Sequence, residues 1–152
     1  MRKNNKGFTL LELMIASAVI IVALAGLLST YVACLELNET TKNTNLALNS
    51  AQKVLEEIRS STFSGIASAY NGYNFSVSGI EVNESLGFVY IDDTDASLLN
   101  ITIGVCWRQR GAKIIGECRD SGGSLVFDST SDANSNGILD SPVQFSTLMA
   151  QR

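Results

Sequence analysis

Histidine is absent from the 152 residues, and its absence excludes several kinds of chemistry. Without an imidazole the chain has no Ser/His/Asp or Cys/His triad, and the commonest side-chain ligand of transition metals is missing. The sequence also shows no pair of carboxylates placed for acid and base chemistry on regular structure. We therefore expect a protein that is not an enzyme and has no catalytic residue.

Positive charge is scarce and unevenly distributed. The 11 Lys and Arg residues against 15 Asp and Glu residues give a formal net charge of −4. Three of the cations, Arg2, Lys3 and Lys6, lie within the first seven residues, so the remainder of the chain carries −7. An acidic body of this kind offers no electrostatic footprint for nucleic acid, and we expect no nucleic-acid contact.

Helix-breaking residues are missing from a long stretch, since neither Pro nor Gly occurs between Leu27 and Ser64. This predicts one continuous helix from Phe8 to about Ser61. Within residues 36–62 apolar side chains recur at helical spacing, which predicts an amphipathic continuation that packs on a sheet. The stripe consists of Leu48, Ala51, Leu55 and Ile58.

One long apolar run lies at the start of this helix. Residues 8–35 read FTLLELMIASAVIIVALAGLLSTYVACL and contain one formal charge, Glu12. About 20 apolar residues are enough to cross a bilayer, so we expect a transmembrane helix. The basic residues 1–7 would stay in the cytoplasm as a leader, which predicts a single-pass inner membrane protein with its C-terminal domain outside. A secretory signal peptide fits less well, because the apolar run is long and no small-x-small site ends it.

Glu12 is the anomaly in this run, because a carboxylate inside an apolar span is costly unless it finds a partner. If the chain were cut after Gly7, Phe8 would present a new α-amino group and Glu12 would be the fifth residue of the product. The amine of a neighbouring subunit could then neutralise the carboxylate in a dry filament core. We therefore interpret Glu12 as an assembly residue.

The segment KGFTLLELMIA, residues 6–16, resembles the cleavage and methylation motif of type IV prepilins and type II secretion pseudopilins. The shared pattern is Gly, an aromatic residue, Thr, Leu, a hydrophobic residue, Glu and a long apolar run. The resemblance implies cleavage between Gly7 and Phe8 by a prepilin peptidase and N-methylation of Phe8. It also implies assembly with other pilin or pseudopilin subunits at a membrane assembly platform.

Three further segments resemble PilV-type minor pilins, and the first of them also resembles the related secretion pseudopilin I. They are the helix end AQKVLEEIRSSTF, the hairpin CWRQRGAKIIGEC with its W-R-x-x-G pattern, and the closing SPVQFSTLMAQR. This resemblance implies a minor subunit, with its position in the filament and the choice between pilus and secretion system left open.

Residues 63–152 change to a period of 2, which predicts β-structure. The strongest face is Leu99, Ile101, Ile103, Val105 and Trp107, with Trp107 as a core anchor. Shorter strand candidates are residues 73–77, 88–91, 113–115, 125–127 and a last strand from 143. The predicted fold class is α+β: a long N-terminal helix packed on a small antiparallel sheet, as in the pilin fold.

The three cysteines divide unevenly. Cys34 lies in the apolar helix, where we expect a buried, inert thiol. Cys106 and Cys118 lie 12 residues apart in a predicted hairpin, and we expect them to form a disulfide in an oxidising compartment.

One loop carries a pattern typical of calcium sites. Asp132, Asn134, Asn136, Gly137 and Asp140 form D-x-N-x-N-G-x-x-D, in which Ile138 would contribute its backbone carbonyl. The bidentate carboxylate expected at the twelfth position is replaced by Val143. Two interpretations stay open: a weak Ca²⁺ site, the one cofactor considered, or a surface loop whose Asn and Asp side chains cap their own backbone.

Two classes of function follow from these observations. The first is a minor pilin or pseudopilin that is cut after Gly7 and assembles through its helix. The second is a membrane-anchored extracytoplasmic binding domain, calcium-dependent, that does not polymerise. They differ at the Gly7 to Phe8 junction, because the second requires an uncut anchor.

Overall fold

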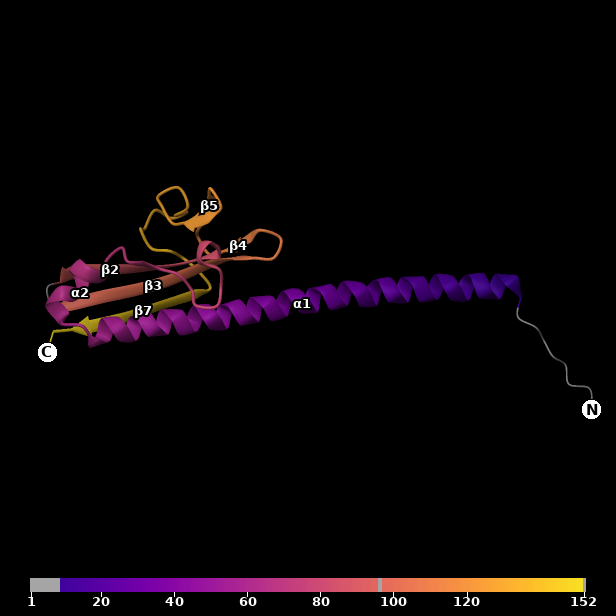
Figure 1. The fold of residues 1–152 in the computed structure, drawn as a ribbon, viewed down its shortest axis with the longest axis horizontal. Helices are drawn as coiled ribbons and strands as arrows, with labels where there is room; N and C mark the ends of the chain where they lie inside the picture. The colour runs from indigo at the N-terminus through magenta and orange to yellow at the C-terminus, as the bar shows by residue number, and fades with distance from the viewer. Residues whose placement is uncertain (1–8, 96, 152) are drawn as a thin grey trace, which may run out of the picture. The chain divides into compact units, whose positions relative to one another are not determined.

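The structure is a computed structural model that describes residues 9–95 and 97–151 (Figure 1). The chain divides into two units, one up to Asn38 and the other from Glu39 onward. Helix α1, Leu10–Ser60, contributes residues to both. Its last residue lies one position from the predicted helix end.

In the first unit, α1 is apolar on all sides. Every residue from Thr9 to Asn38 is exposed in the single chain, and the helix is long and apolar enough to cross a membrane. The hydroxyls of Ser17 and Thr30 donate to helix carbonyls three and four residues earlier, at 2.9 and 3.0 Å. These polar groups are therefore satisfied inside the helix, as a lipid environment requires.

In the second unit, α1 buries one stripe against a sheet. The stripe is Asn43, Ala47, Ala51, Val54, Leu55 and Ile58. The spacings of three and four residues place these side chains on one face, as the sequence predicts, although Leu48 is only partly buried. The small residues Ala47 and Ala51 allow the helix to approach the strands closely.

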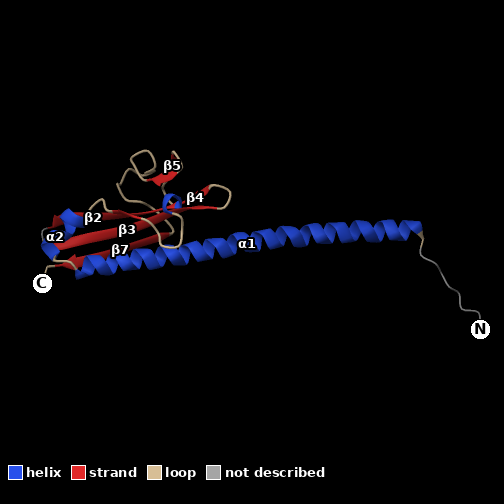
Figure 2. Ribbon diagram, viewed as in Figure 1, coloured by secondary structure: helices blue, strands red, loops and turns tan. Residues whose placement is uncertain are grey.

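The sheet has five antiparallel strands with β3 at its centre (Figure 2). Strand β2 pairs with one flank of β3, and the other flank is shared by β7 and β4. Strand β1 pairs with β2 at the opposite edge, and β5 and β6 form a separate hairpin. The strands are β1 Asn74–Phe75, β2 Ser85–Asp95, β3 Leu98–Gln109, β4 Lys113–Ile115, β5 Arg119–Ser121, β6 Ser124–Val126 and β7 Val143–Ala150.

The main core lies between α1 and this sheet. The predicted alternating face of β3 is buried there, and Trp107 is fully enclosed, so its role as a core anchor is confirmed. A smaller cluster lies on the other face of the sheet, where Cys106 of β3 packs with Leu125 of β6 and with Leu139. The observed arrangement is the predicted α+β fold, an apolar N-terminal helix packed against an antiparallel sheet.

The sequence did not predict two short helices, and it predicted one strand longer than the structure has it. Residues 63–70 form a second helix, α2 Phe63–Tyr70, where no element was expected, and a short 3-10 helix, η1 Val82–Glu84, precedes β2. The alternating residues 73–77 yield only the two-residue β1, because side chains take the next backbone donors. The N–H of Val77 bonds to Oγ of Ser85 at 3.1 Å, and that of Ser78 bonds to Oγ of Ser50 at 3.3 Å.

Candidate functional site

The first candidate site is the N-terminal end of α1. Gly7 and Phe8, the predicted cleavage and methylation positions, lie outside the described residues. Thr9 precedes the helix, and its Oγ1 accepts a hydrogen bond from the N–H of Glu12 at 3.3 Å. The T-x-x-E spacing is that of a capping box, so Thr9 begins the helix and Glu12 lies in its first turn.

The position of Glu12 suits a carboxylate for a local reason as well. The first turn of a helix carries the positive end of the helix dipole, which stabilises a negative side chain. Glu12 is exposed, and no ion pair to it is found among the described residues. Its carboxylate is therefore available for a group that another chain would supply.

The rest of this site is an apolar surface. The large hydrophobic side chains from Leu10 to Leu28 are all more than half exposed, and Leu10 reaches 78%. Exposed apolar patches of this extent mark contact with lipid or with another protein. The surface is thus suited to a bilayer and to packing against other helices.

The second candidate site is the disulfide, which the structure confirms. Cys106 and Cys118 are bonded, with their Cα atoms 6.2 Å apart. Gly116 makes room for the bond, because a Cβ at that position would lie 2.9 Å from Cβ of Cys106. The expectation of a buried thiol at Cys34 was wrong for the single chain, where this cysteine is free and exposed.

Next to the disulfide, Arg108 joins three elements. Its Nη1 lies 3.2 Å from Glu84 of η1, and its Nη2 lies 2.8 Å from Asp120 of β5. The contact with Asp120 is an ion pair whose angles do not fit a hydrogen bond, so Nη2 of Arg108 has no hydrogen-bond partner. Sequence reasoning missed this cluster, because its members lie far apart in the chain and follow no spacing rule.

The third candidate site is the Asp and Asn loop on the opposite face of the sheet from α1. Asp132 is 8% exposed and accepts hydrogen bonds from the N–H of Asn136 at 3.3 Å and of Gly137 at 2.7 Å. Oδ1 of Asn136 accepts from the N–H of Ile138 at 2.7 Å. Nδ2 of Asn134 donates to Asp140 at 2.8 Å. The loop side chains therefore fold back on their own segment.

This geometry includes the self-capping that one interpretation of the loop expects. It leaves the calcium interpretation untested, because an oxygen that accepts one hydrogen bond keeps a second lone pair. Among residues 9–95 and 97–151, no three His, Cys, Asp or Glu side chains converge as a metal site. A cation here would depend on the two carboxylates of Asp132 and Asp140, on the amide oxygens of Asn134 and Asn136 and on the carbonyl of Ile138.

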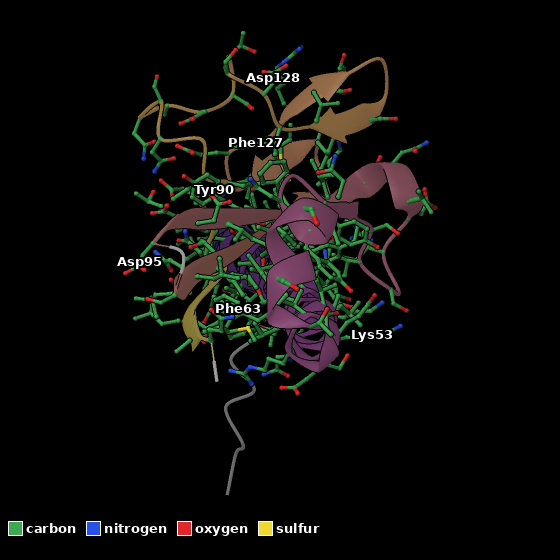
Figure 3. All side chains as sticks on the ribbon, turned by 90° about the vertical axis from the view of Figure 1, so that its left-hand side faces the viewer. Lys53, Phe63, Tyr90, Asp95, Phe127 and Asp128 are labelled. Carbon is green, nitrogen blue, oxygen red and sulfur yellow. A yellow bond between two sulfur atoms is a disulfide. The ribbon has the colours of Figure 1, made fainter. Side chains whose placement is uncertain are left out.

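Beside this loop lies a cavity of about 400 Å³, with Phe88 and Phe127 in its wall. Their ring centroids are 5.1 Å apart. Asp128 lies at its rim and is bound by Arg119, whose Nε and Nη2 are 2.9 and 2.6 Å from Oδ2. The hydrogen bond from Arg119, followed by that from Thr130, lowers the pKa of Asp128. Figure 3 places Phe127 and Asp128 together, away from Lys53 of α1.

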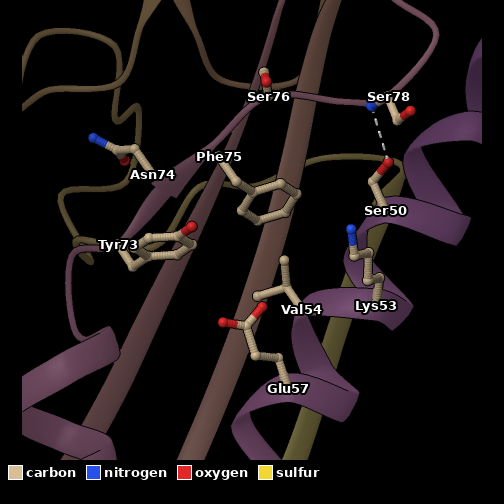
Figure 4. A pocket seen from close by; sticks show the side chains of 9 residues that line it. All are labelled: Ser50, Lys53, Val54, Glu57, Tyr73, Asn74, Phe75, Ser76 and Ser78. Atoms are coloured by element: carbon tan, nitrogen blue, oxygen red, sulfur yellow. Dashed lines mark hydrogen bonds between the residues drawn. The ribbon is translucent and has the colours of Figure 1, made fainter.

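A second cavity, of about 410 Å³, lies between α1 and the segment around β1 (Figure 4). The helix contributes Lys53 and Glu57, and the other side carries Tyr73 and Phe75, whose rings are stacked at 6.5 Å. The sequence did not predict this groove, because it assigned the two aromatic residues to one face of a longer strand.

Comparison with known proteins supports the first candidate site. Residues 2–28 match the family described as the prokaryotic N-terminal methylation motif. The match contains Gly7, Phe8 and Glu12, and such a motif implies processing by a prepilin peptidase and pilus assembly. Neither curated proteins nor solved structures gave a match to this chain. The chain thus carries, at residues 2–28, the methylation motif of type IV pilin-like and pseudopilin-like proteins, which are typically structural subunits.

Proposed function

We propose that this chain is a minor pilin or pseudopilin, a structural subunit of a type IV pilus or a type II secretion filament. In this proposal the prepilin peptidase cuts after Gly7, Phe8 is N-methylated, and the chain enters the filament through α1. Residues 1–7 act as the cytoplasmic leader, residues 8–35 as the membrane span and filament core, and residues 36–62 as the amphipathic continuation of the helix. Residues 63–152 form the extracytoplasmic domain.

The observation that carries the proposal is the exposed, nearly uncharged surface of α1. Glu12 is the one charged residue between Thr9 and Leu35 in a helix that is exposed throughout this range. A helix that is apolar on all sides is stable only when another medium or another protein covers it. A bilayer covers it before assembly, and neighbouring helices cover it afterwards.

Glu12 makes the packing between neighbouring helices in the filament specific. An ionised carboxylate in a dry core must be paired, and the α-amine of Phe8 on a neighbouring subunit supplies the opposite charge. Because the described residues offer Glu12 no cation, pairing across subunits costs no existing ion pair.

The assignment to a minor subunit rests on resemblance in three segments and on the composition of α1. The resemblance to PilV-type proteins covers the end of α1, the β3–β4 hairpin and β7, and α1 contains no Pro, which many major pilins carry in their helix. The identity of the neighbouring subunits would distinguish a pilus from a secretion filament.

Incorporation of a Glu12→Ala variant into filaments tests the proposal. Leader removal and membrane retention should stay close to wild type, because the variant keeps Gly7, Phe8 and the apolar helix. The variant should be absent from sheared filaments or secretion pseudopili. Glu36→Ala, a change of the same type beyond the span, is the matched control and should assemble. Normal incorporation of Glu12→Ala would refute the role of this carboxylate.

The alternative, an anchored binding domain that does not polymerise, predicts a different outcome. Its helix would stay uncut, and Glu12→Ala would behave like wild type in every fraction. The Asp132 to Asp140 loop would then be the binding element, and its response to Ca²⁺ would matter more than the state of the N-terminus.

A further inference from the structure

The tip of the β3–β4 hairpin, residues 109–113, is fastened to the start of the second unit. The backbone N–H of Arg110 donates to Oε1 of Glu39 at 3.0 Å, and its Nε lies 3.7 Å from Oε2 of the same carboxylate. Nε2 of Gln109 donates to Oγ1 of Thr40. These contacts hold the hairpin tip beside residues 39 and 40.

The chain itself sets how far these residues can lie from a membrane. The apolar run ends at Leu35, four residues before Glu39. Four residues span about 6 Å as helix and at most about 14 Å when fully extended. The polar headgroup layer on each side of the hydrocarbon is about 5 to 8 Å thick. When α1 spans the bilayer, Glu39 and the hairpin tip fastened to it therefore lie at or just outside the headgroups.

The charges at this level are mostly positive. Arg110 is 73% exposed despite its contact with Glu39, and Lys42 and Lys113 are also exposed. With Glu39 they give this group a net charge of +2, and Glu36, the first residue after the apolar run, lowers the total at the level of the headgroups to +1. Residues 39–152 as a whole hold eight Lys and Arg against thirteen Asp and Glu, a net charge of −5, so the rest of the second unit carries −7. The second unit is thus positive where the chain leaves the membrane and negative elsewhere.

We propose that the β3–β4 tip docks on the anionic phosphate headgroups of the membrane while α1 is inserted, with Arg110 and Lys113 as the contacts. The inference rests on the proposed membrane span and goes beyond it, because it concerns how the outer domain is held. An anionic surface attracts the positive end and repels the acidic remainder, so both forces favour one orientation. Because the membrane span and the contacts with residues 39 and 40 hold the tip near the surface, a weak contact is enough for docking.

The experiment uses the full chain in nanodiscs of phosphatidylcholine alone or of an equimolar mixture with phosphatidylglycerol. A spin label is attached at Ala112→Cys in a Cys34→Ala background, because Cys34 is free and exposed while Cys106 and Cys118 are bonded. Paramagnetic broadening of the lipid ³¹P signal reports the proximity of the label to phosphates. Retention of the chain in the disc is measured separately.

Broadening is expected in discs with phosphatidylglycerol, with much less in phosphatidylcholine and at high ionic strength. Arg110→Gln and Lys113→Gln should each lower the ratio of docked to undocked chains about fivefold. Lys53→Gln, an exposed cation elsewhere on α1, is the matched control and should change nothing. Equal broadening in both lipids, or none with the chain retained, would overturn the docking. Failure to stay in the disc would contradict the membrane span itself.

Discussion

Glu117 and Asp140 hold each other through two hydrogen bonds. The N–H of Glu117 donates to the carbonyl of Asp140 at 2.9 Å, and the N–H of Asp140 donates to Oε2 of Glu117 at 3.4 Å. Glu117 is the neighbour of Cys118, which is bonded to Cys106 of β3. The disulfide therefore fastens to β3 not only its own turn but also the end of the Asp and Asn loop.

Removal of the disulfide should destabilise the second unit. Cys118→Ser frees a loop of about a dozen residues, and the chain-entropy model gives a loss of about 3 kcal/mol in the free energy of unfolding. Denaturant unfolding of the full chain in detergent measures the change. Cys34→Ser, which removes a free thiol, is the control and should leave the transition in place. A Cys118→Ser variant as stable as the control would contradict this role.

Calcium should stabilise the chain weakly if the loop from Asp132 to Asp140 binds it. Two carboxylates and no bidentate ligand from the loop predict a dissociation constant of about 10⁻⁴ to 10⁻³ M. A tenfold excess of Ca²⁺ over that constant would raise the free energy of unfolding by about 1.4 kcal/mol. Thermal unfolding with millimolar Ca²⁺ or with chelator measures the increment.

The control for calcium must separate binding from capping, because Asp132 also bonds to backbone N–H groups. Asp132→Ala should lower stability under both conditions and remove the increment. Asp93→Ala, near the exposed end of β2, should keep it. If the wild-type transition does not move with Ca²⁺, the loop is a self-capping turn and the calcium interpretation is wrong.

Acid should weaken the contact between Arg119 and Asp128. The folded chain lowers the pKa of Asp128, chiefly through the hydrogen bond from Arg119. A lowered pKa adds stability above the unfolded value of about 3.9, and this contribution is lost as the pH falls through the folded pKa. Asp128→Asn should therefore be less stable than wild type at neutral pH, with a gap that narrows below pH of about 4. A gap that stays constant in acid would contradict the assignment.

A methyl group at Gly104 should disrupt the centre of the sheet. A Cβ there would lie 2.1 Å from the backbone oxygen of Leu139, which cannot move as a side chain could. Gly104→Ala should cost about 1 to 3 kcal/mol in the free energy of unfolding. Gly65→Ala in α2, where the nearest atom is Oγ1 of Thr62 at 3.4 Å, is the control. Equal stability of the two variants would show that the loop around Leu139 adapts freely.

The sequence predicts those elements whose own residues carry a strong period. The apolar run and the stripe to Ile58 indicate α1, the alternation from Leu99 to Trp107 indicates β3, and residues 113–115 match β4 at both ends. The methylation motif is also local, so one segment is enough to indicate it. The disulfide could be predicted because its hairpin was.

Elements whose own residues carry no apolar period, or that depend on side chains elsewhere in the chain, could not be predicted in the same way. Strand β5 is polar and exposed, and it forms because β6 pairs with it. Strand β1 is short because Ser50, 28 residues before Ser78, and Ser85, eight residues after Val77, take the backbone donors beyond it. The fastening of Arg110 to Glu39 likewise joins residues 71 positions apart, and no sequence spacing indicates it.

The N-terminus of the chain produced in cells with an active prepilin peptidase tests the central claim most directly. Intact-mass and N-terminal analysis of membrane-extracted protein should find a chain that begins at N-methylated Phe8, and the same chain from peptidase-deficient cells should still begin at Met1. A chain that begins at Met1 in both kinds of cell would contradict the proposal that this protein is a processed filament subunit.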